Sequence, residues 1–151
     1  MNTQIIRAPA FQRPSGKLYL AAAQFNLINT IPTLVLLDSI GAGYKDGIEN
    51  TVTHRITPGV AGFYSIKGKI LLNSVQLSAV FSAFIYINGV NRDTNHFSAA
   101  QLGLLTLPCG MDIYLSAIDY VELWVTSVNG DNTADIVAGV ETTFLSVQRV
   151  R

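Results

Sequence analysis

From Lys17 onward, glycine, asparagine and proline interrupt the sequence at short intervals. The runs between them are rich in valine, isoleucine, leucine, threonine and aromatic residues. Branched and aromatic side chains favour extended strands, whereas glycine, asparagine and proline favour turns. Many short strands separated by turns are typical of an all-β sandwich or barrel. We therefore predict an antiparallel all-β sandwich of about 8–10 strands over residues 17–151.

The strands are expected where such runs occur, and the last run is long enough for two strands. They are 18–25, 32–38, 51–56, 62–73, 79–88, 102–107, 112–117, 120–128 and 134–149. Side chains alternate between the two faces of a strand, so every second residue shares a face. In 62–73 one face carries Tyr64, Ile66, Ile70 and Leu72, and the other carries Phe63, Ser65, Lys67 and Lys69. The first face is predicted to lie in the core and the second to be of mixed character.

Two other runs carry large side chains on both faces. In 120–128, Leu123 and its neighbours face one way while Trp124 faces the other, and 79–88 has the same character. Burial on both faces of an antiparallel strand indicates another layer or another subunit. Only 13% of the residues are charged, against ~25% in an average soluble domain. We therefore expect contact between subunits, and Trp124 is a candidate contact residue because its face needs cover.

Several classes of partner are not expected. Ten basic residues balance ten acidic ones without a basic cluster, so nucleic acid is an unexpected partner. No apolar run approaches the ~18 residues that span a bilayer, so no membrane partner is expected. The N-terminal stretch lacks the sustained apolar region of a secretory signal peptide. Cys109 is the only cysteine, which excludes an internal disulfide, and it is predicted to be a small buried side chain beside Pro108.

Residues 1–16 contain prolines, serine and glycine but no hydrophobic period. We predict an extended N-terminal arm here, separate from the domain of residues 17–151. Its apolar and basic side chains could become ordered on the surface of another protein. The candidate attachment residues are Ile5, Ile6, Arg7, Phe11 and Arg13.

No catalytic or metal-binding motif is present. His54, expected in a strand, and His96, expected in a polar loop, are the only imidazoles, and neither lies in a hydrolase or zinc motif. The glycines of 41–47 resemble a phosphate-binding loop, but their spacing differs and no helix is expected to follow. Residues 129–135 offer oxygen ligands for calcium or form a solvated hairpin turn. We predict no enzymatic activity, no cofactor and no metal.

Four segments resemble strands of one jelly-roll superfamily. They are PGVAGFYSIKGKI at 58–70, FIYINGV at 84–90, IDYVELWV at 118–125 and TTFLSVQRV at 142–150. They are similar to strands of the superfamily that includes the globular heads of complement and the tumour necrosis factor cytokines. Within it, the chain looks most like versions found in bacteriophage virion proteins. The resemblance implies a jelly-roll sandwich.

The resemblance also implies a homotrimer in which one sheet of each copy packs around a three-fold axis. Phe144 aligns with the aromatic residue that opens the family's last strand, and Ser146 stands where the backbones approach the axis most closely. Ser65 and Lys67 join the predicted interface because they lie on the mixed face of 62–73. Lys67 and Lys69 then need a carboxylate, for which Glu122 and Glu141 are candidates, or they face solvent at a channel or rim.

Two functions remain open. The first is a structural virion protein on the particle surface, a trimeric decoration protein that attaches through its arm to the major capsid protein or another virion protein. The second is the receptor-binding head of a phage tail or head fibre, which recognises a cell-surface glycan or protein. In the second case, loops at 41–50 and 91–99 are expected to make the contacts.

Overall fold

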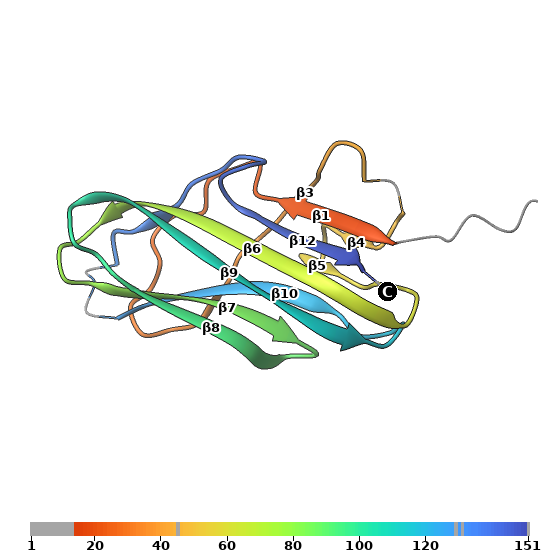
Figure 1. Cartoon of the computed structure of the whole chain (residues 1–151). Coiled ribbons are helices and arrows are strands. Elements are labelled where there is room, and N and C mark those ends of the chain that lie inside the picture. Colours follow the sequence, from red (N-terminus) through yellow and green to blue (C-terminus); the bar gives the residue numbers. More distant parts are fainter. Residues whose placement is uncertain (1–13, 45, 129, 131, 151) are drawn as a thin grey trace, which may run out of the picture.

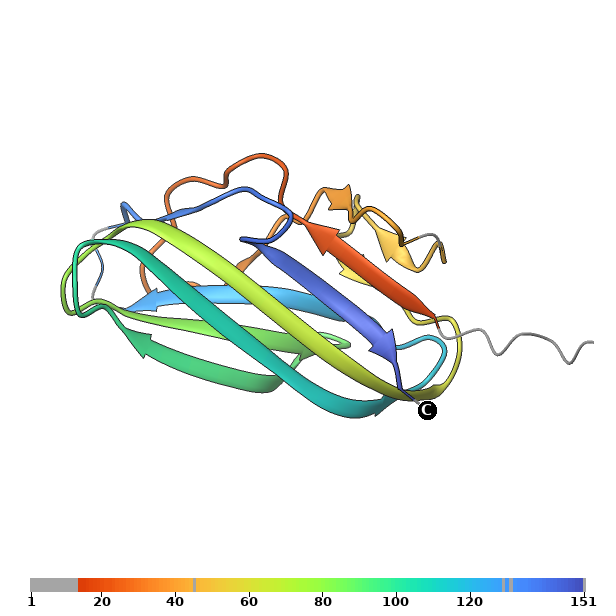
Figure 2. The same cartoon turned by 45° about the horizontal axis from the view of Figure 1, so that its top comes forward.

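A computed structural model describes residues 14–44, 46–128, 130 and 132–150 of the chain. In these residues two antiparallel sheets face each other, and the long strands β6 and β9 run the length of the molecule (Figures 1 and 2). The strands are β1 (Ser15–Tyr19), β2 (Thr33–Leu34), β3 (Ser39–Ile40), β4 (Glu49–Asn50), β5 (Arg55–Ile56), β6 (Gly62–Val75), β7 (Val80–Ile87), β8 (Val90–Ser98), β9 (Gly103–Leu115), β10 (Val121–Val128), β11 (Asp135–Ile136) and β12 (Phe144–Arg149).

Sheet A has the order β3-β1-β12-β6-β9, with β11 beside β6 beyond the end of β12. Sheet B has the order β4-β5-β10-β7-β8, with β2 beside β10. The eight principal strands in chain order are β1, β5, β6, β7, β8, β9, β10 and β12. Numbered in that way, their orders in the sheets are 1-8-3-6 and 2-7-4-5, which is the double Greek key of a jelly roll. The predicted all-β jelly-roll sandwich is confirmed.

The core lies between the sheets and is made by every second residue of the long strands. In β6, Tyr64, Ile66, Ile70 and Leu72 are almost completely buried, as the alternation predicts. In β10, Val121, Leu123 and Val125 face them from the opposite sheet. Full burial stabilises an aliphatic side chain of this size by about 1.5–3 kcal/mol each, so the two-residue period of these strands determines the fold.

Two expected strands join into one. Residues 102–107 and 112–117 belong to β9, which continues through Pro108 and Gly110. Proline is tolerated because β9 is an edge strand and the polar backbone atoms of Pro108 and Gly110 point away from β6. The carbonyl oxygen of Pro108 accepts a hydrogen bond from Asn95 Nδ2 at 3.0 Å. The amide of Gly110 donates to Asp93 Oδ2 at 3.0 Å. Side chains of β8 thus cover the middle of the β9 edge.

The prediction of a loop at 91–99 is wrong, because most of these residues form strand β8. β8 is the edge of sheet B and pairs only with β7. Its side chains are largely exposed or half-buried, so backbone pairing holds it and no hydrophobic alternation marks it. His96 accordingly lies in a strand.

The remaining differences concern strand ends. β1 begins at Ser15, inside the expected arm, and ends at Tyr19. Of the expected strand 51–56 only Arg55 and Ile56 are extended, and His54 adopts a left-handed turn with φ of 57°. The last run does form two strands, β11 and β12, with a turn at Gly139 between them.

A close approach between the sheets generates the first testable prediction. Gly68 faces sheet B, and a Cβ atom there would lie 2.7 Å from Cys109 Sγ and 2.7 Å from Leu123 Cδ1. We expect Gly68→Ala to lower the free energy of unfolding by about 1–3 kcal/mol because the added methyl overpacks the core. Urea denaturation measures this difference. Thr106→Ala, at an exposed site on β9, is the control and should cost clearly less; an equal loss in both variants would contradict the prediction.

Candidate subunit interface

The side chains of sheet A that point away from sheet B form one surface, here called the outer face of sheet A. On it Ser146 of β12 lies opposite Lys67 of β6, and Lys67 lies opposite Gly110 of β9. In the next row Ser65 lies opposite Asp112, and on the other side of the Ser146 row Phe144 lies opposite Lys69. Directly opposed residues share a face. The structure therefore brings together Phe144, Ser146, Ser65 and Lys67, four of the five residues predicted for the interface.

Trp124 is the fifth, and it lies on the other sheet. It is in β10, opposite Phe84 of β7 and Leu34 of β2, and it faces away from the core. Its ring centroid is 5.0 Å from that of Tyr86, and its Nε1 donates to Glu122 Oε2 at 3.1 Å. The cover that this tryptophan needs comes partly from its own sheet. Trp124 does not share a surface with the other four residues.

A lysine that sequence reasoning did not single out supports Phe144. Lys17 of β1 is 91% buried, and its Nζ lies 4.4 Å from the centre of the Phe144 ring. The same atom is 2.7 Å from Glu141 Oε1. Lys69 Nζ donates to the backbone oxygen of Glu141 at 2.8 Å. The carboxylate of Glu141 therefore pairs with Lys17, and Lys69 reaches only its backbone oxygen. Among the described residues, neither Glu122 nor Glu141 forms the expected ion pair with Lys67 or Lys69.

The outer face of sheet A also carries an aromatic pair that the sequence analysis missed. Phe63 of β6 and Tyr114 of β9 are directly opposite, with ring centroids 5.4 Å apart in edge-to-face geometry. Phe63 is 48% exposed and Tyr114 is 55% exposed. Exposed aromatic side chains on a sheet face are common at protein contacts, which are enriched in Tyr and Phe. The pair adds apolar area to this face.

Between β6 and β9 the outer face of sheet A is hollowed by a depression of about 400 Å³. Lys67, Asp112 and Gly110 are among the residues that line it. A Cβ atom on Gly110 would lie 2.6 Å from the backbone oxygen of Ile66, so no side chain fits here. The depression is open to solvent. It can therefore accept a side chain of another molecule, but it cannot enclose a small ligand.

The remaining candidate groups are engaged in the fold. His54 Nδ1 is 3.0 Å from the backbone oxygen of Leu37, and His96 Nδ1 is 2.6 Å from Ser82 Oγ. Asp135 accepts a hydrogen bond from the amide of Asn26, and Asn132 accepts one from the amide of Asn29. Asp131 lies outside the described residues. In the described part of the chain, no three His, Cys, Asp or Glu side chains come together as a metal site.

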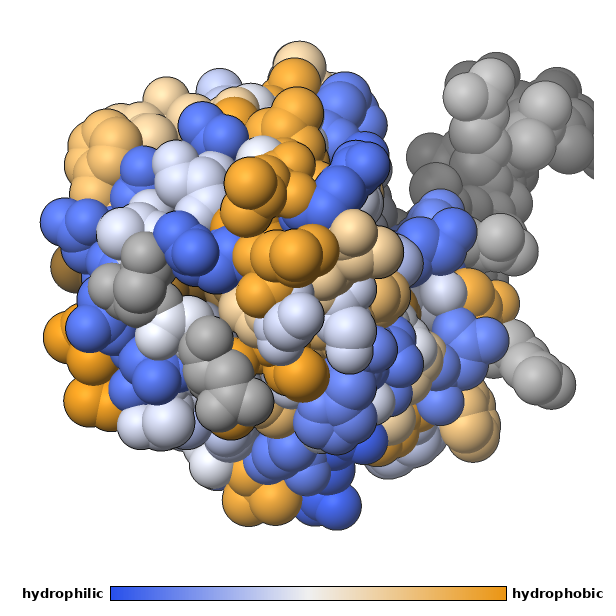
Figure 3. All heavy atoms as spheres, turned by 90° about the vertical axis from the view of Figure 1, so that its left-hand side faces the viewer, coloured by the Kyte–Doolittle hydropathy of each residue, from blue (hydrophilic) through white to orange (hydrophobic). Residues whose placement is uncertain are grey.

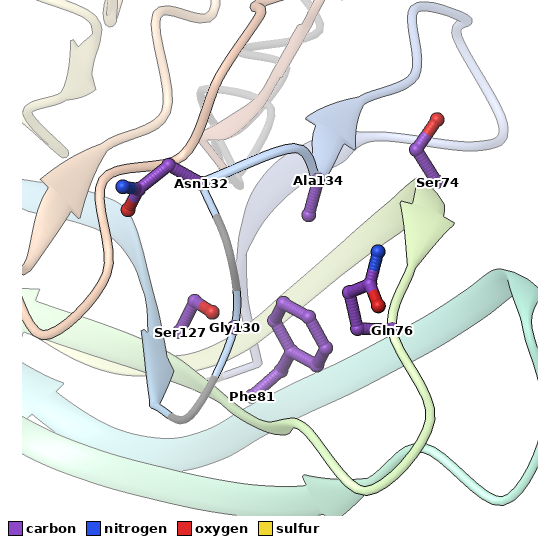
Figure 4. A pocket seen from close by; sticks show the side chains of 7 residues that line it. All are labelled: Ser74, Gln76, Phe81, Ser127, Gly130, Asn132 and Ala134. Atoms are coloured by element: carbon purple, nitrogen blue, oxygen red, sulfur yellow. The ribbon is translucent and has the colours of Figure 1, made fainter.

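A crevice at one end of the sandwich offers no ligand site. The ring of Phe81 lies in its middle, as Figure 4 shows, and the crevice has no room for a water-sized molecule. The residues around it are Ser74, Gln76, Phe81, Ser127, Gly130, Asn132 and Ala134. At the same end, the turns after β6 and β8 expose Leu77 and Leu102. Figure 3 shows the hydrophobic side chains of this end in separate areas divided by hydrophilic ones.

The five predicted attachment residues, Ile5, Ile6, Arg7, Phe11 and Arg13, lie outside the described residues. The described chain starts at Pro14, whose carbonyl oxygen accepts a hydrogen bond from the amide of Arg149 at 3.0 Å. The two ends of the described chain therefore lie side by side (Figure 1). Over this part of the chain no helix is long and apolar enough to cross a membrane.

Two facing sheets with this strand order define a jelly roll. The chain is similar to the crystal structure of murine APRIL, with a TM-score of 0.68 and 12% identity over 92% of this chain and 100% of that one. It is also similar to the structure of Eiger TNF from S. frugiperda, with a TM-score of 0.62 and 9% identity over 92% of this chain and 93% of that one. No family model and no curated protein matches the sequence. At these identities the likeness concerns the fold alone.

Cys109 generates a prediction about pH. Burial, together with the Asp93 carboxylate, raises the pKa of its thiol from 9.0 to about 12. The folded state then holds the thiol proton more tightly than the unfolded state. Below pH 9 the thiol is protonated in both states and the free energy of unfolding keeps its full value, and as the pH rises from 9 towards 12 the unfolded state loses the proton first and this free energy falls. We expect the unfolding free energy to fall over this range by less in Cys109→Ala than in the parent protein. Urea titrations at pH 8 and pH 10.5 measure the difference, and identical pH slopes would refute it.

Proposed function

We propose that this chain forms a homotrimer through the outer face of sheet A and decorates the surface of a virus particle, of the bacteriophage type, to which residues 1–13 attach it. The proposal of a homotrimer is supported by the residues that lie on this face. Four residues predicted for a three-fold contact lie together there, beside an exposed aromatic pair and an open depression. The exposed aromatic pair is the part of this face that is typical of a protein contact surface, where Tyr and Phe are enriched.

The position of Pro14 supports attachment through the arm. The described chain begins at one end of the sandwich, where Pro14 lies beside Arg149. Thirteen residues reach at most about 45 Å when fully extended. An arm of this length can bind a capsid surface directly below the trimer while the sandwich stays outside, and the apolar Ile5, Ile6 and Phe11 with the basic Arg7 and Arg13 provide its contacts. The partner is then the major capsid protein or another virion protein, and the location is the particle surface.

A receptor-binding head is the second candidate, and the aromatic cluster of sheet B favours it. Trp124, Tyr86 and Phe84 are half-buried neighbours on the face that a trimer built on sheet A leaves free. Aromatic rings with hydrogen-bonding groups beside them suit a cell-surface glycan or protein. In this case Trp124 contributes to recognition, and the particle is bound to a host cell through sheet B.

Replacement of Phe144 tests the trimer. We expect the parent protein to sediment as a trimer at micromolar concentration. Phe144→Ala removes an aromatic contact from three symmetric copies, at a cost of about 3 kcal/mol for each copy. The variant should therefore sediment as a monomer or dissociate at a clearly lower temperature. Phe84→Ala, at a half-buried site opposite Trp124 on sheet B, is the matched control and should stay trimeric. A monomeric parent protein would overturn the proposal.

Deletion of residues 1–13 tests attachment and leaves β1 intact, because the strand begins at Ser15. We expect the melting temperature of the trimer to change by no more than about 2 °C, since the removed residues precede the sandwich. Binding to particles that lack the protein should be lost. Co-sedimentation with such particles measures it. A shortened trimer that binds with the parent affinity would exclude the arm as the attachment site and favour the receptor-binding function.

A further inference from the structure

Two charged side chains flank the depression on the outer face of sheet A. Lys67 lies directly opposite Gly110, and Asp112 lies two residues further along β9, opposite Ser65. Both side chains are exposed. Among the described residues neither has an ion-pair partner, although Lys17 on the same face is paired with Glu141. A positive and a negative group thus lie beside Gly110, and neither forms an ion pair within the described part of the chain.

The depression gives these charges room for a partner from another molecule. Gly110 cannot be replaced by a larger residue without a contact of 2.6 Å between the new Cβ and the oxygen of Ile66. The volume of about 400 Å³ above it is therefore a consequence of the backbone geometry of β6 and β9. This volume can hold a long side chain that enters from outside the subunit.

The symmetry of a trimer and the charges on this face indicate which side chain enters the depression. In a cyclic trimer each contact is heterologous, so a residue of one copy meets a different residue of the next. If the outer face of sheet A turns towards the axis, Lys67 loses water, and an unpaired buried lysine costs several kcal/mol. The neighbouring copy presents its own Asp112 on the same face, beside its own depression and with the opposite charge. Charge complementarity then favours a second copy of this chain over a partner of uniform charge.

We propose that Lys67 of one copy pairs with Asp112 of the next copy, three times around the axis, and that this lysine side chain lies in the depression above Gly110 of that next copy. This inference rests on the homotrimer proposed above. The pair fixes the rotation of one copy against the next, because like charges meet in other registers. The contact is therefore specific to this chain and selects against mixed assembly with other jelly rolls.

The experiment begins with the parent protein, Lys67→Glu and Asp112→Lys, each examined by sedimentation over a concentration series. Each variant carries three like-charge contacts in its trimer. We expect the concentration at which half of the trimer dissociates to rise about tenfold or more in both variants. Circular dichroism and thermal unfolding of each variant report whether the subunit itself is folded. Arg92→Glu, at an exposed site on β8, is the control charge reversal and should leave the trimer unchanged.

Mixing the two variants is the decisive step. A trimer with two Lys67→Glu chains and one Asp112→Lys chain has two attractive contacts and one repulsive contact if the pair joins different copies. Trimer should then reappear at a concentration where each variant alone is monomeric. If the pair formed within one chain, every chain would keep its own like-charge contact, and mixing would restore nothing.

The experiment distinguishes a failure of the proposed homotrimer from a failure of the proposed pair. A parent protein that is monomeric throughout the series overturns the homotrimer and this pair with it. A trimeric parent protein whose two variants are equally stable, or whose mixture stays monomeric, overturns the pair alone and leaves the homotrimer in place.

Discussion

The pairing of β6 with three other strands is the constraint on which the rest of the structure depends. β12 and β11 lie along one side of it and β9 lies along the other. Its inward residues form much of the core, and its outward residues stand in fixed rows with those of β12 and β9. The absence of a side chain at Gly68 leaves room for Cys109 on the neighbouring strand β9 and for Leu123 of the opposite sheet. The geometry of the outer face of sheet A follows from the same register.

Much of the fold is predictable from the sequence because the central strands are buried on one side. β6 shows a clear two-residue period in its sequence, whereas β7 and β10 carry large side chains on both faces, and all three strands are found close to their expected positions. β8 is not predictable in this way, since an edge strand is held by backbone hydrogen bonds that leave no trace in the side chains. β9 was expected as two strands because Pro108 usually ends a strand, and only the structure shows that its missing amide faces an edge.

The candidate subunit interface is predictable in part, because side-chain alternation shows which residues of a strand share a face. Alternation indicates that Trp124 points away from the core, but it does not indicate which sheet carries the residue. The resemblance to a known superfamily places Phe144 and Ser146, and the period of β6 places Ser65 and Lys67 with them. The pairing of Lys17 with Glu141 joins residues 124 positions apart, and no local pattern reveals such a contact. The depression at Gly110 depends on a backbone approach that only coordinates show.

The side-chain cover on the β9 edge limits how copies of this protein can assemble. Pro108 has no amide hydrogen to offer, and its carbonyl oxygen and the amide of Gly110 are already bonded to β8. The middle of this edge therefore offers a strand from another molecule no free backbone donor or acceptor at Pro108 and Gly110, so sheet A cannot be extended there by another strand. Growth into an open-ended β fibre is disfavoured along this edge. Association through side chains on a sheet face has no such obstacle.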